Sequence, residues 1–252
     1  EQRGARAQAR IAAASLEVNH RRTACVADMK PPRPRLLTIA IALAALAAGT
    51  VLYLTTTHRR VDAACSVRNF EGSRFIVCTL DTRRAELRLV SRGHNQIYLR
   101  TFAALNTMLG RDASRLRFAM NAGMFNDAGA PIGLYVEDGA QGHRLALTEG
   151  PGNFHLKPNG VFWQDDSGAL HIDASDRYVA LGAHPRFATQ SGPMLVIDGA
   201  LHPRFAADGA SHYIRNGVGV LDARTAYFVI SDDSVSFGRF ARFFRDGLHC
   251  RN

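Results

Sequence analysis

The hydrophobic positions fall into one long uninterrupted run near the start of the chain and many short runs after it. Residues 36–57 carry no charge, and their centre reads LLTIAIALAALAAGTVLYL. At about 1.5 Å of rise per residue, a helix of this length spans roughly the 30 Å hydrocarbon core of a bilayer. Lys30, Arg33 and Arg35 precede the run, a placement that holds the N-terminal side in the cytoplasm. The pattern predicts one N-terminal hydrophobic helix.

This helix is either a membrane anchor or part of a cleaved signal peptide. Ala45-Leu46-Ala47 provides a small-residue cleavage site, but the apolar run continues beyond it to Leu54. That continuation favours an anchor that contacts the membrane through residues 36–54. In both cases we expect the rest of the chain to be periplasmic or otherwise extracytoplasmic, and either anchored in the inner membrane or secreted.

The composition on either side of this run divides the chain into three parts. Residues 1–28 are rich in Ala and Arg and lack a hydrophobic period, and Met29 opens a basic stretch typical of export signals. We interpret residues 1–28 as a disordered or non-native upstream segment and residues 29–60 as the signal peptide or anchor. Residues 61–252 are expected to form one folded domain.

The short apolar runs after residue 64 alternate with Gly, Pro, Asn and Asp, as strands joined by turns do. The expected strands are 75–80, 86–90, 116–120, 132–137, 161–164, 170–173, 194–197, 217–221 and 225–231. The first two are expected to pair across the polar turn 81–84. Helical spacing of apolar residues predicts helices at 101–109 and 236–246. Because short connections favour antiparallel pairing, the predicted fold class is α+β, mostly antiparallel sheet with few helices.

Charge and cysteine positions narrow the functional classes. The chain has a net charge of +9, but ten basic and three acidic residues lie in residues 1–60, which leaves 21 basic and 19 acidic residues for 61–252. A nearly neutral domain excludes nucleic acid as an expected partner. Cys65 and Cys78 are 13 residues apart and could form a disulfide in an oxidising compartment or remain buried thiols. Cys250 has no evident partner.

The candidate chemistry lies in four polar, glycine-bearing junctions at the ends of expected strands. They are residues 120–126, 150–160, 189–193 and 214–220, which we number as junctions one to four in chain order. Glycine allows close approach of backbones, and Asn tolerates the same bends while adding an amide. Junctions two and four also carry a cation, Lys157 and Arg215. The pattern predicts a polar pocket for a hydroxyl-rich, anionic ligand. Neither metal-ligand spacing of histidines nor a hydrolase or cofactor motif is present, so no cofactor is expected.

At these junctions the sequence resembles the phosphodiester glycosidase family. The stretches that carry the resemblance are, in order, NAGMF, GNFHLKPNGVF, ATQSGPMLVIDG, IRNGVGV and FVISDD. The chain departs from the family pattern at Ala122, Met124, Asn216, Gly217 and Asp233-Ser234. The resemblance covers about residues 65–252 and implies hydrolysis of a sugar 1-phosphodiester. It also implies an incomplete C-terminus and an inactive fragment, because the family continues with a strand and an acidic glycine loop.

The resemblance implies a role for each candidate side chain. Arg215 would neutralise the phosphate, with Lys157 as a second cation, because a fork of N–H donors suits phosphate oxygens. Asp232 would activate water or stabilise an oxocarbenium-like transition state. Asn121 completes the catalytic set, and Ser191 would bind sugar hydroxyls or phosphate. The other substrate-binding candidates are Gly123, Asn153, Asn159 and Gly192.

Structural alternatives exist for several of these residues, and for the function as a whole. Asp232 could cap the last helix, Arg215 could form a structural ion pair, and Asn121 could bind backbone at a bend. Asp198, in Ile-Asp-Gly, is expected in a hairpin turn. The rival functions are a non-catalytic carbohydrate or cell-envelope binding module and an envelope scaffold.

Overall fold

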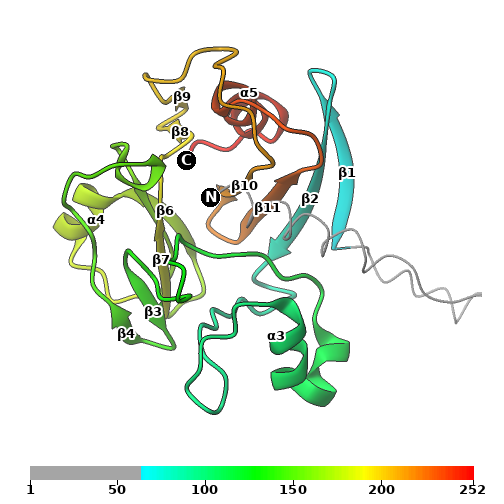
Figure 1. Ribbon diagram of the computed structural model, residues 1–252, viewed down its shortest axis with the longest axis vertical. Helices are drawn as coiled ribbons and strands as arrows, with labels where there is room; N and C mark the ends of the chain where they lie inside the picture. The colour runs from blue at the N-terminus through cyan, green and yellow to red at the C-terminus, as the bar shows by residue number, and fades with distance from the viewer. Residues whose placement is uncertain (1–63) are drawn as a thin grey trace, which may run out of the picture. The chain divides into compact units, whose positions relative to one another are not determined.

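The computed structural model describes residues 64–252 (Figure 1). The predicted hydrophobic helix and the expected boundaries at residues 28 and 60 lie outside the described residues. Within residues 64–252, every helix falls short of the length and hydrophobicity that a transmembrane span requires.

The first sheet brings together the two ends of the described chain. Its strands are β1 (Cys65–Phe70), β2 (Ser73–Asp81), β10 (Asn216–Asp222) and β11 (Thr225–Ser231). They pair antiparallel in the order β1-β2-β11-β10. Cys65 lies opposite Cys78 and forms a disulfide with it, so the bridge considered from the sequence is confirmed. Cys250 is a free, buried thiol, and burial raises its pKa to about 12.

One face of this sheet is covered by the predicted C-terminal helix. Helix α5 (Phe237–Arg242) begins at Ser236, whose hydroxyl accepts a hydrogen bond from the Arg239 N–H at 3.1 Å, and continues as a π-helical turn over Phe243–Gly247. Its apolar stripe packs against alternate residues of β2 and β11. The buried members of this core include Phe75, Val77, Val229, Phe240, Phe243 and Phe244. Most of the stripe is therefore core packing, as its helical period predicts, whereas Phe237 lies outside this core.

The second sheet carries the middle of the chain. Its strands are β3 (Tyr135–Glu137), β4 (Ala140–His143), β5 (Gly160–Gln164), β6 (Leu170–Ala174) and β7 (Phe187–Ser191), in the antiparallel order β4-β3-β7-β5-β6. Helix α4 (Ser175–Leu181) follows β6, and β8 (Val196–Ile197) and β9 (Ala200–Leu201) form a small hairpin. A core cluster of Leu80, Phe162, Leu170 and Ala226 joins the two sheets.

The α+β class and the mostly antiparallel sheet are confirmed, and so is a helix at α3 (Phe102–Leu109). The expected strands at 86–90 and 116–120 are wrong. Strand β2 pairs instead with β1 and β11, whereas Leu87 packs on the core from an extended loop without pairing. Strand β1 escaped prediction because it is an edge strand whose residues are mostly exposed and polar.

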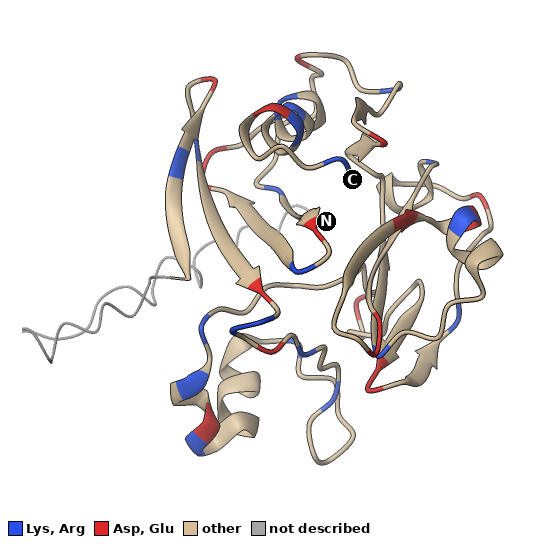
Figure 2. Ribbon diagram, turned by 180° about the vertical axis from the view of Figure 1, so that it is seen from behind, with Lys and Arg blue, Asp and Glu red and all other residues tan. Residues whose placement is uncertain are grey.

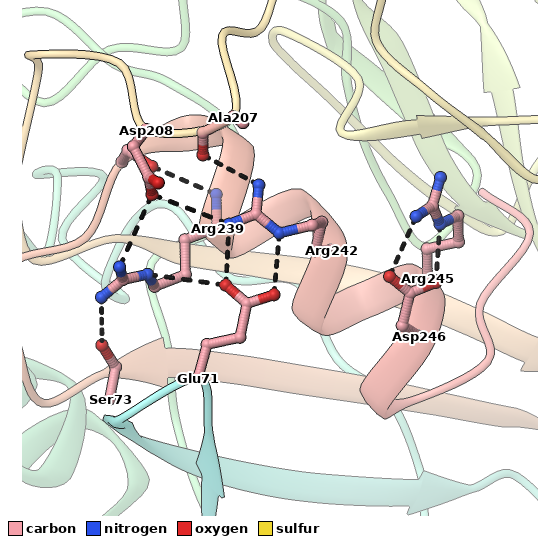
Figure 3. Close-up of polar contacts among 9 residues, drawn as sticks. Glu71, Ser73, Ala207, Asp208, Arg239, Arg242, Arg245 and Asp246 are labelled. Carbon is pink, nitrogen blue, oxygen red and sulfur yellow. Dashed lines mark hydrogen bonds and ion pairs between the residues drawn. The ribbon is translucent and has the colours of Figure 1, made fainter.

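An ion-pair network fastens the β1–β2 turn to α5 (Figure 3). The Glu71 carboxylate accepts two hydrogen bonds from Arg242, at 2.8 Å from Nε and 2.7 Å from Nη2, and lies 3.7 Å from Arg239. Asp208 pairs with both arginines from a separate loop. The Arg242 hydrogen bonds hold the pKa of Glu71 below its ordinary value. The network therefore ties three segments that are distant in sequence.

Replacing Glu71 by Gln is expected to remove about 1 kcal/mol of stability at neutral pH, because a partly exposed two-point arginine pair contributes at this level. A lowered folded-state pKa gives stability that is present above the unfolded pKa and is lost as the pH falls through the folded value. The difference in unfolding free energy between wild type and Glu71→Gln should therefore be largest at pH 7. It should disappear well below pH 4.5, the ordinary pKa of a glutamate. Urea unfolding across this range measures it. A difference that is independent of pH would contradict the ion-pair account.

Candidate functional site

Junctions two and three meet at the end of β7. Ser191, the last residue of β7, lies opposite Gly160 of β5. The following residue, Gly192, packs so closely that an added Cβ would lie 2.6 Å from the Phe154 carbonyl oxygen and 2.8 Å from Asn159 Cβ. Only glycine allows two backbones to approach in this way. The Ser-Gly-Pro turn is therefore seated directly on the loop that carries Asn153 and Asn159.

Junction one lies against the same strand. The Gly123 N–H donates a hydrogen bond to Thr189 Oγ1 at 2.8 Å. A Cβ at Gly123 would lie 2.3 Å from the Gln190 carbonyl oxygen. The strand itself is held by the buried Gln190 amide, whose oxygen accepts hydrogen bonds from Leu134 N–H and Ala146 N–H. The sequence pattern marked this junction, but nothing in it distinguished Gln190 as its support.

Junction one also reaches junction four. The Asn216 side-chain amide donates a hydrogen bond to the Asn121 carbonyl oxygen at 3.3 Å. Asn216 begins β10 and directly follows Arg215. Contacts thus connect all four junctions, from the Asn153 loop through β7 and the Asn121 bend to Arg215. The Asn121 backbone takes part in these contacts through its carbonyl oxygen.

Arg215 is buried without an acidic partner. Its Nε donates a hydrogen bond to the Val235 carbonyl oxygen at 2.9 Å, and Nη2 donates to the Ser211 carbonyl oxygen at 2.8 Å. Only 9% of its surface is exposed, and burial lowers its pKa to about 10. Within residues 64–252, its side chain contacts no carboxylate and Nη1 has no hydrogen-bond acceptor. The structural ion pair considered for Arg215 is absent from the described residues.

A column of rings holds this guanidinium in place. Arg215 Cζ lies 3.5 Å from the ring centroid of Phe237, a cation–π geometry. Phe237 stacks on Phe205 at 5.0 Å, and Phe205 stacks on His202 at 4.6 Å. We call His202, Phe205 and Phe237 the aromatic column. It was not predicted, because its members are separated in sequence and a single histidine carries no motif.

The column ends at junction two. His202 Nδ1 accepts a hydrogen bond from the Arg204 N–H at 3.2 Å, so Nε2 carries the proton and donates to the Lys157 carbonyl oxygen, also at 3.2 Å. Burial lowers the pKa of His202, which favours this neutral form. The column therefore links the Lys157 loop to Arg215 by a second route.

The remaining candidates have their own partners. Asp232 Oδ2 lies 2.5 Å from Nη2 of Arg74 on β2, and Ser236 rather than Asp232 caps α5. Both Arg74 and Asp232 are well exposed, and no contact joins Asp232 to Arg215. The Lys157 ammonium donates to the Leu147 carbonyl oxygen.

Two further residues have structural positions. Asn159 is almost fully buried and braces its loop by donating to the Phe154 carbonyl oxygen at 3.1 Å. Asp198 has a positive φ of 51° in the turn between β8 and β9, as expected for a hairpin turn.

A separate surface pocket of about 360 Å³ lies at the other end of β5. Its lining comes from the 82–87 loop, the 164–168 turn and Arg186, and includes none of the predicted site residues. Within residues 64–252, no three His, Cys, Asp or Glu side chains are grouped closely enough to hold a metal ion.

Comparison with known proteins adds two findings. Residues 114–252 match the family model described as phosphodiester glycosidase, a range that contains all four junctions and Asp232. The chain is also 40% identical over 129 residues to the uncharacterized protein YigE of Escherichia coli (strain K12). That alignment covers 50% of this chain and 49% of YigE, so the chain spans about half the length of this relative.

The packing of junction one against β7 can be tested by adding a single methyl group at Gly123. Gly123→Ala is expected to cost about 1–3 kcal/mol, because the added Cβ meets backbone and a bound hydroxyl that cannot yield easily. The matched control is Gly209→Ala, where the nearest atom would lie at 3.8 Å. Urea unfolding of both variants gives the comparison. Equal stability of the two variants would mean that junction one is not packed on β7.

Proposed function

The chain belongs to the phosphodiester glycosidase family, and on that premise we propose that its folded part hydrolyses a sugar 1-phosphodiester at the anomeric carbon. In this reaction the bond between the anomeric carbon and the phosphate oxygen breaks, and the bonding pair leaves with the phosphate monoester. A water oxygen forms the new bond to the anomeric carbon, and one water proton passes to a base or to solvent.

The observation that carries the proposal is the buried charge of Arg215, which has no carboxylate partner within residues 64–252. A cation removed from water is costly unless an anion compensates it. Here backbone carbonyl oxygens and the Phe237 ring supply partial compensation, while Nη1 keeps its donors unused within the described residues. A phosphodiester provides the missing negative charge and accepts hydrogen bonds from a guanidinium. Arg215 would then neutralise a leaving group that needs no proton from the protein.

Asp232 is the proposed carboxylate for the water. The pairing of β10 with β11 places Arg215 beside Ser231, whose hydroxyl accepts a hydrogen bond from the Arg215 N–H at 2.9 Å. Asp232 follows Ser231 directly, at the exposed end of β11. Its Arg74 partner occupies one carboxylate oxygen. The other oxygen could accept a proton from water or face the positive charge that develops at the anomeric carbon.

The sugar is proposed to lie over the bends that meet at β7. Ser191 is exposed at the end of the strand, beside the loop that carries Asn153. Asn121 is held beside junction four, where its carbonyl oxygen accepts a hydrogen bond from Asn216. Hydroxyl and amide groups on converging bends suit the donor and acceptor pattern of a sugar. Lys157, on the same loop as Asn153, would be the second cation for the phosphate.

We further propose that the folded part works outside the cytoplasm, either anchored in the inner membrane or secreted. The Cys65–Cys78 disulfide supports this, because such bridges form and persist in oxidising compartments.

The decisive test measures release of reducing sugar from a panel of sugar 1-phosphate methyl diesters by the full-length protein. Arg215→Gln is expected to reduce kcat/KM by about 10²–10³-fold, because it removes charge stabilisation from the transition state. Arg215→Lys, which keeps the charge but loses the fork, should retain part of the activity. Asp232→Asn should reduce kcat more than it changes KM.

The control is Arg68→Gln, an exposed arginine on β1 that should leave kcat/KM unchanged. Circular dichroism and thermal unfolding of each variant separate lost chemistry from lost folding. Tight binding of the diesters without any sugar release would favour the non-catalytic binding module. Release that survives Arg215→Gln in a folded protein would remove Arg215 from the proposed mechanism.

A further inference from the structure

A long segment between the two sheets has no core of its own. No residue from 81 to 132 is buried. The segment is held near both of its ends. Leu87 packs against the core shared by the two sheets, and the Phe118 ring lies 5.2 Å from that of Phe228. Between these points the chain forms α3 and its flanking loops, which lie away from both sheets in Figure 1. Long unpaired segments in folded domains are commonly functional.

Helix α3 is apolar but contributes no fully buried residue to a core. Six of its eight residues (FAALNTML) are apolar, and none is buried. Ile97 is 64% exposed just before the helix, and Leu116 is 44% exposed after it. An exposed apolar helix with apolar neighbours indicates a binding surface rather than a structural element.

The same segment concentrates positive charge. Residues 83–117, which we call the basic segment, contain eight arginines and two acids, Glu86 and Asp112. All eight arginine side chains are exposed: Arg83, Arg84, Arg88, Arg92, Arg100, Arg111, Arg115 and Arg117. The other described residues, 64–82 and 118–252, hold 13 basic and 16 acidic residues. Figure 2 shows the blue positions around α3 and its loops.

The start of the described chain lies at the same end of the first sheet. The Thr79 N–H donates a hydrogen bond to the Ala64 carbonyl oxygen at 2.8 Å, and the disulfide holds Cys65 against Cys78. Residue 82, where the chain leaves β2 for the basic segment, is three positions beyond Thr79. The sequence predicts a bilayer contact through residues 36–54, and the ten residues 55–64 reach at most about 36 Å. The chain that precedes Ala64 and the chain that leads into the basic segment therefore start from the same end of this sheet.

We propose that the basic segment binds the surface of an anionic phospholipid bilayer. The apolar side chains of α3 enter the boundary between headgroups and acyl chains, and the arginines contact lipid phosphates. Counting Asp81, which pairs with Arg83 and Arg84, residues 81–117 still have an excess of five positive charges. This excess favours an anionic bilayer over a second copy of the chain, because two basic segments would repel each other. The proposal is independent of the hydrolase reaction, since it involves none of the residues assigned to that reaction.

Hydrogen–deuterium exchange of the full chain reconstituted in vesicles tests the proposal. One set of vesicles is pure phosphatidylcholine, and the other contains about one-third phosphatidylserine. Both sets hold the chain through its N-terminal part, so a difference between them reports on lipid charge. Amides of residues 102–109 should exchange at least about tenfold more slowly on the anionic vesicles. The protection should disappear in about 1 M salt, where the Debye length is only about 3 Å.

Matched triple variants identify the surface. Arg111→Gln/Arg115→Gln/Arg117→Gln should abolish the lipid-dependent protection. Arg68→Gln/Arg144→Gln/Arg204→Gln removes three exposed arginines elsewhere and should retain it. Exchange of β2 and β11 amides verifies that each variant is folded.

Three results would overturn the proposal. The first is equal protection on neutral and anionic vesicles. The second is protection that grows with protein concentration in the absence of lipid, which would assign the surface to a second copy. The third is full protection in the variant that lacks Arg111, Arg115 and Arg117.

Discussion

A single buried amide, that of Gln190, determines where most of the candidate site lies. Its oxygen accepts hydrogen bonds from two backbone N–H groups, and its nitrogen donates to the Ala146 carbonyl oxygen and to Ser175 Oγ. Every hydrogen-bonding group of the side chain is therefore paired, and the partners lie in three separate segments, at Leu134, Ala146 and Ser175. A buried polar group left unpaired costs about 1–3 kcal/mol, so these segments cannot shift independently. Gly123 packs against the strand held in this way, and Gly192, just beyond the strand, packs against the loop that carries Asn153 and Asn159.

The same residue type, arginine, stabilises this fold in two opposite ways. Arg242 is paired with Glu71 and Asp208 near the surface, where each charge has a counter-charge and water remains within reach. Arg215 is buried and, within residues 64–252, is surrounded by carbonyl oxygens, a hydroxyl and the rings of Phe237 and Tyr213. The first arrangement needs nothing more to be stable. The second leaves a positive charge only partly compensated within the described residues, and such a site gains the most from binding an anion.

The sequence predicted features whose signals lie within a few neighbouring residues, and it missed contacts between residues that are distant in sequence. Strands such as β11, with a regular apolar pattern, and the glycine-bearing bends were predictable because their signals lie within a few neighbouring residues. The Arg74–Asp232 pair joins residues that are distant in sequence, and no local pattern reports it. The aromatic column is a similar case, because His202 and Phe237 become neighbours only through Phe205. Edge strand β1 failed for another reason: half of its pairing capacity and most of its side chains face solvent.

Burial also determines how the two positively charged parts of the molecule respond to solution conditions. The arginines of the basic segment are exposed, so their attraction to any anionic surface is screened by salt over about 10 Å at moderate ionic strength. Arg215 is only 9% exposed, so its attraction to a phosphate would be screened less by salt. Its pKa of about 10 is lowered by burial but still leaves the guanidinium charged near neutral pH. A phosphate site built on Arg215 would thus keep its charge under conditions that weaken the surface contacts of the basic segment.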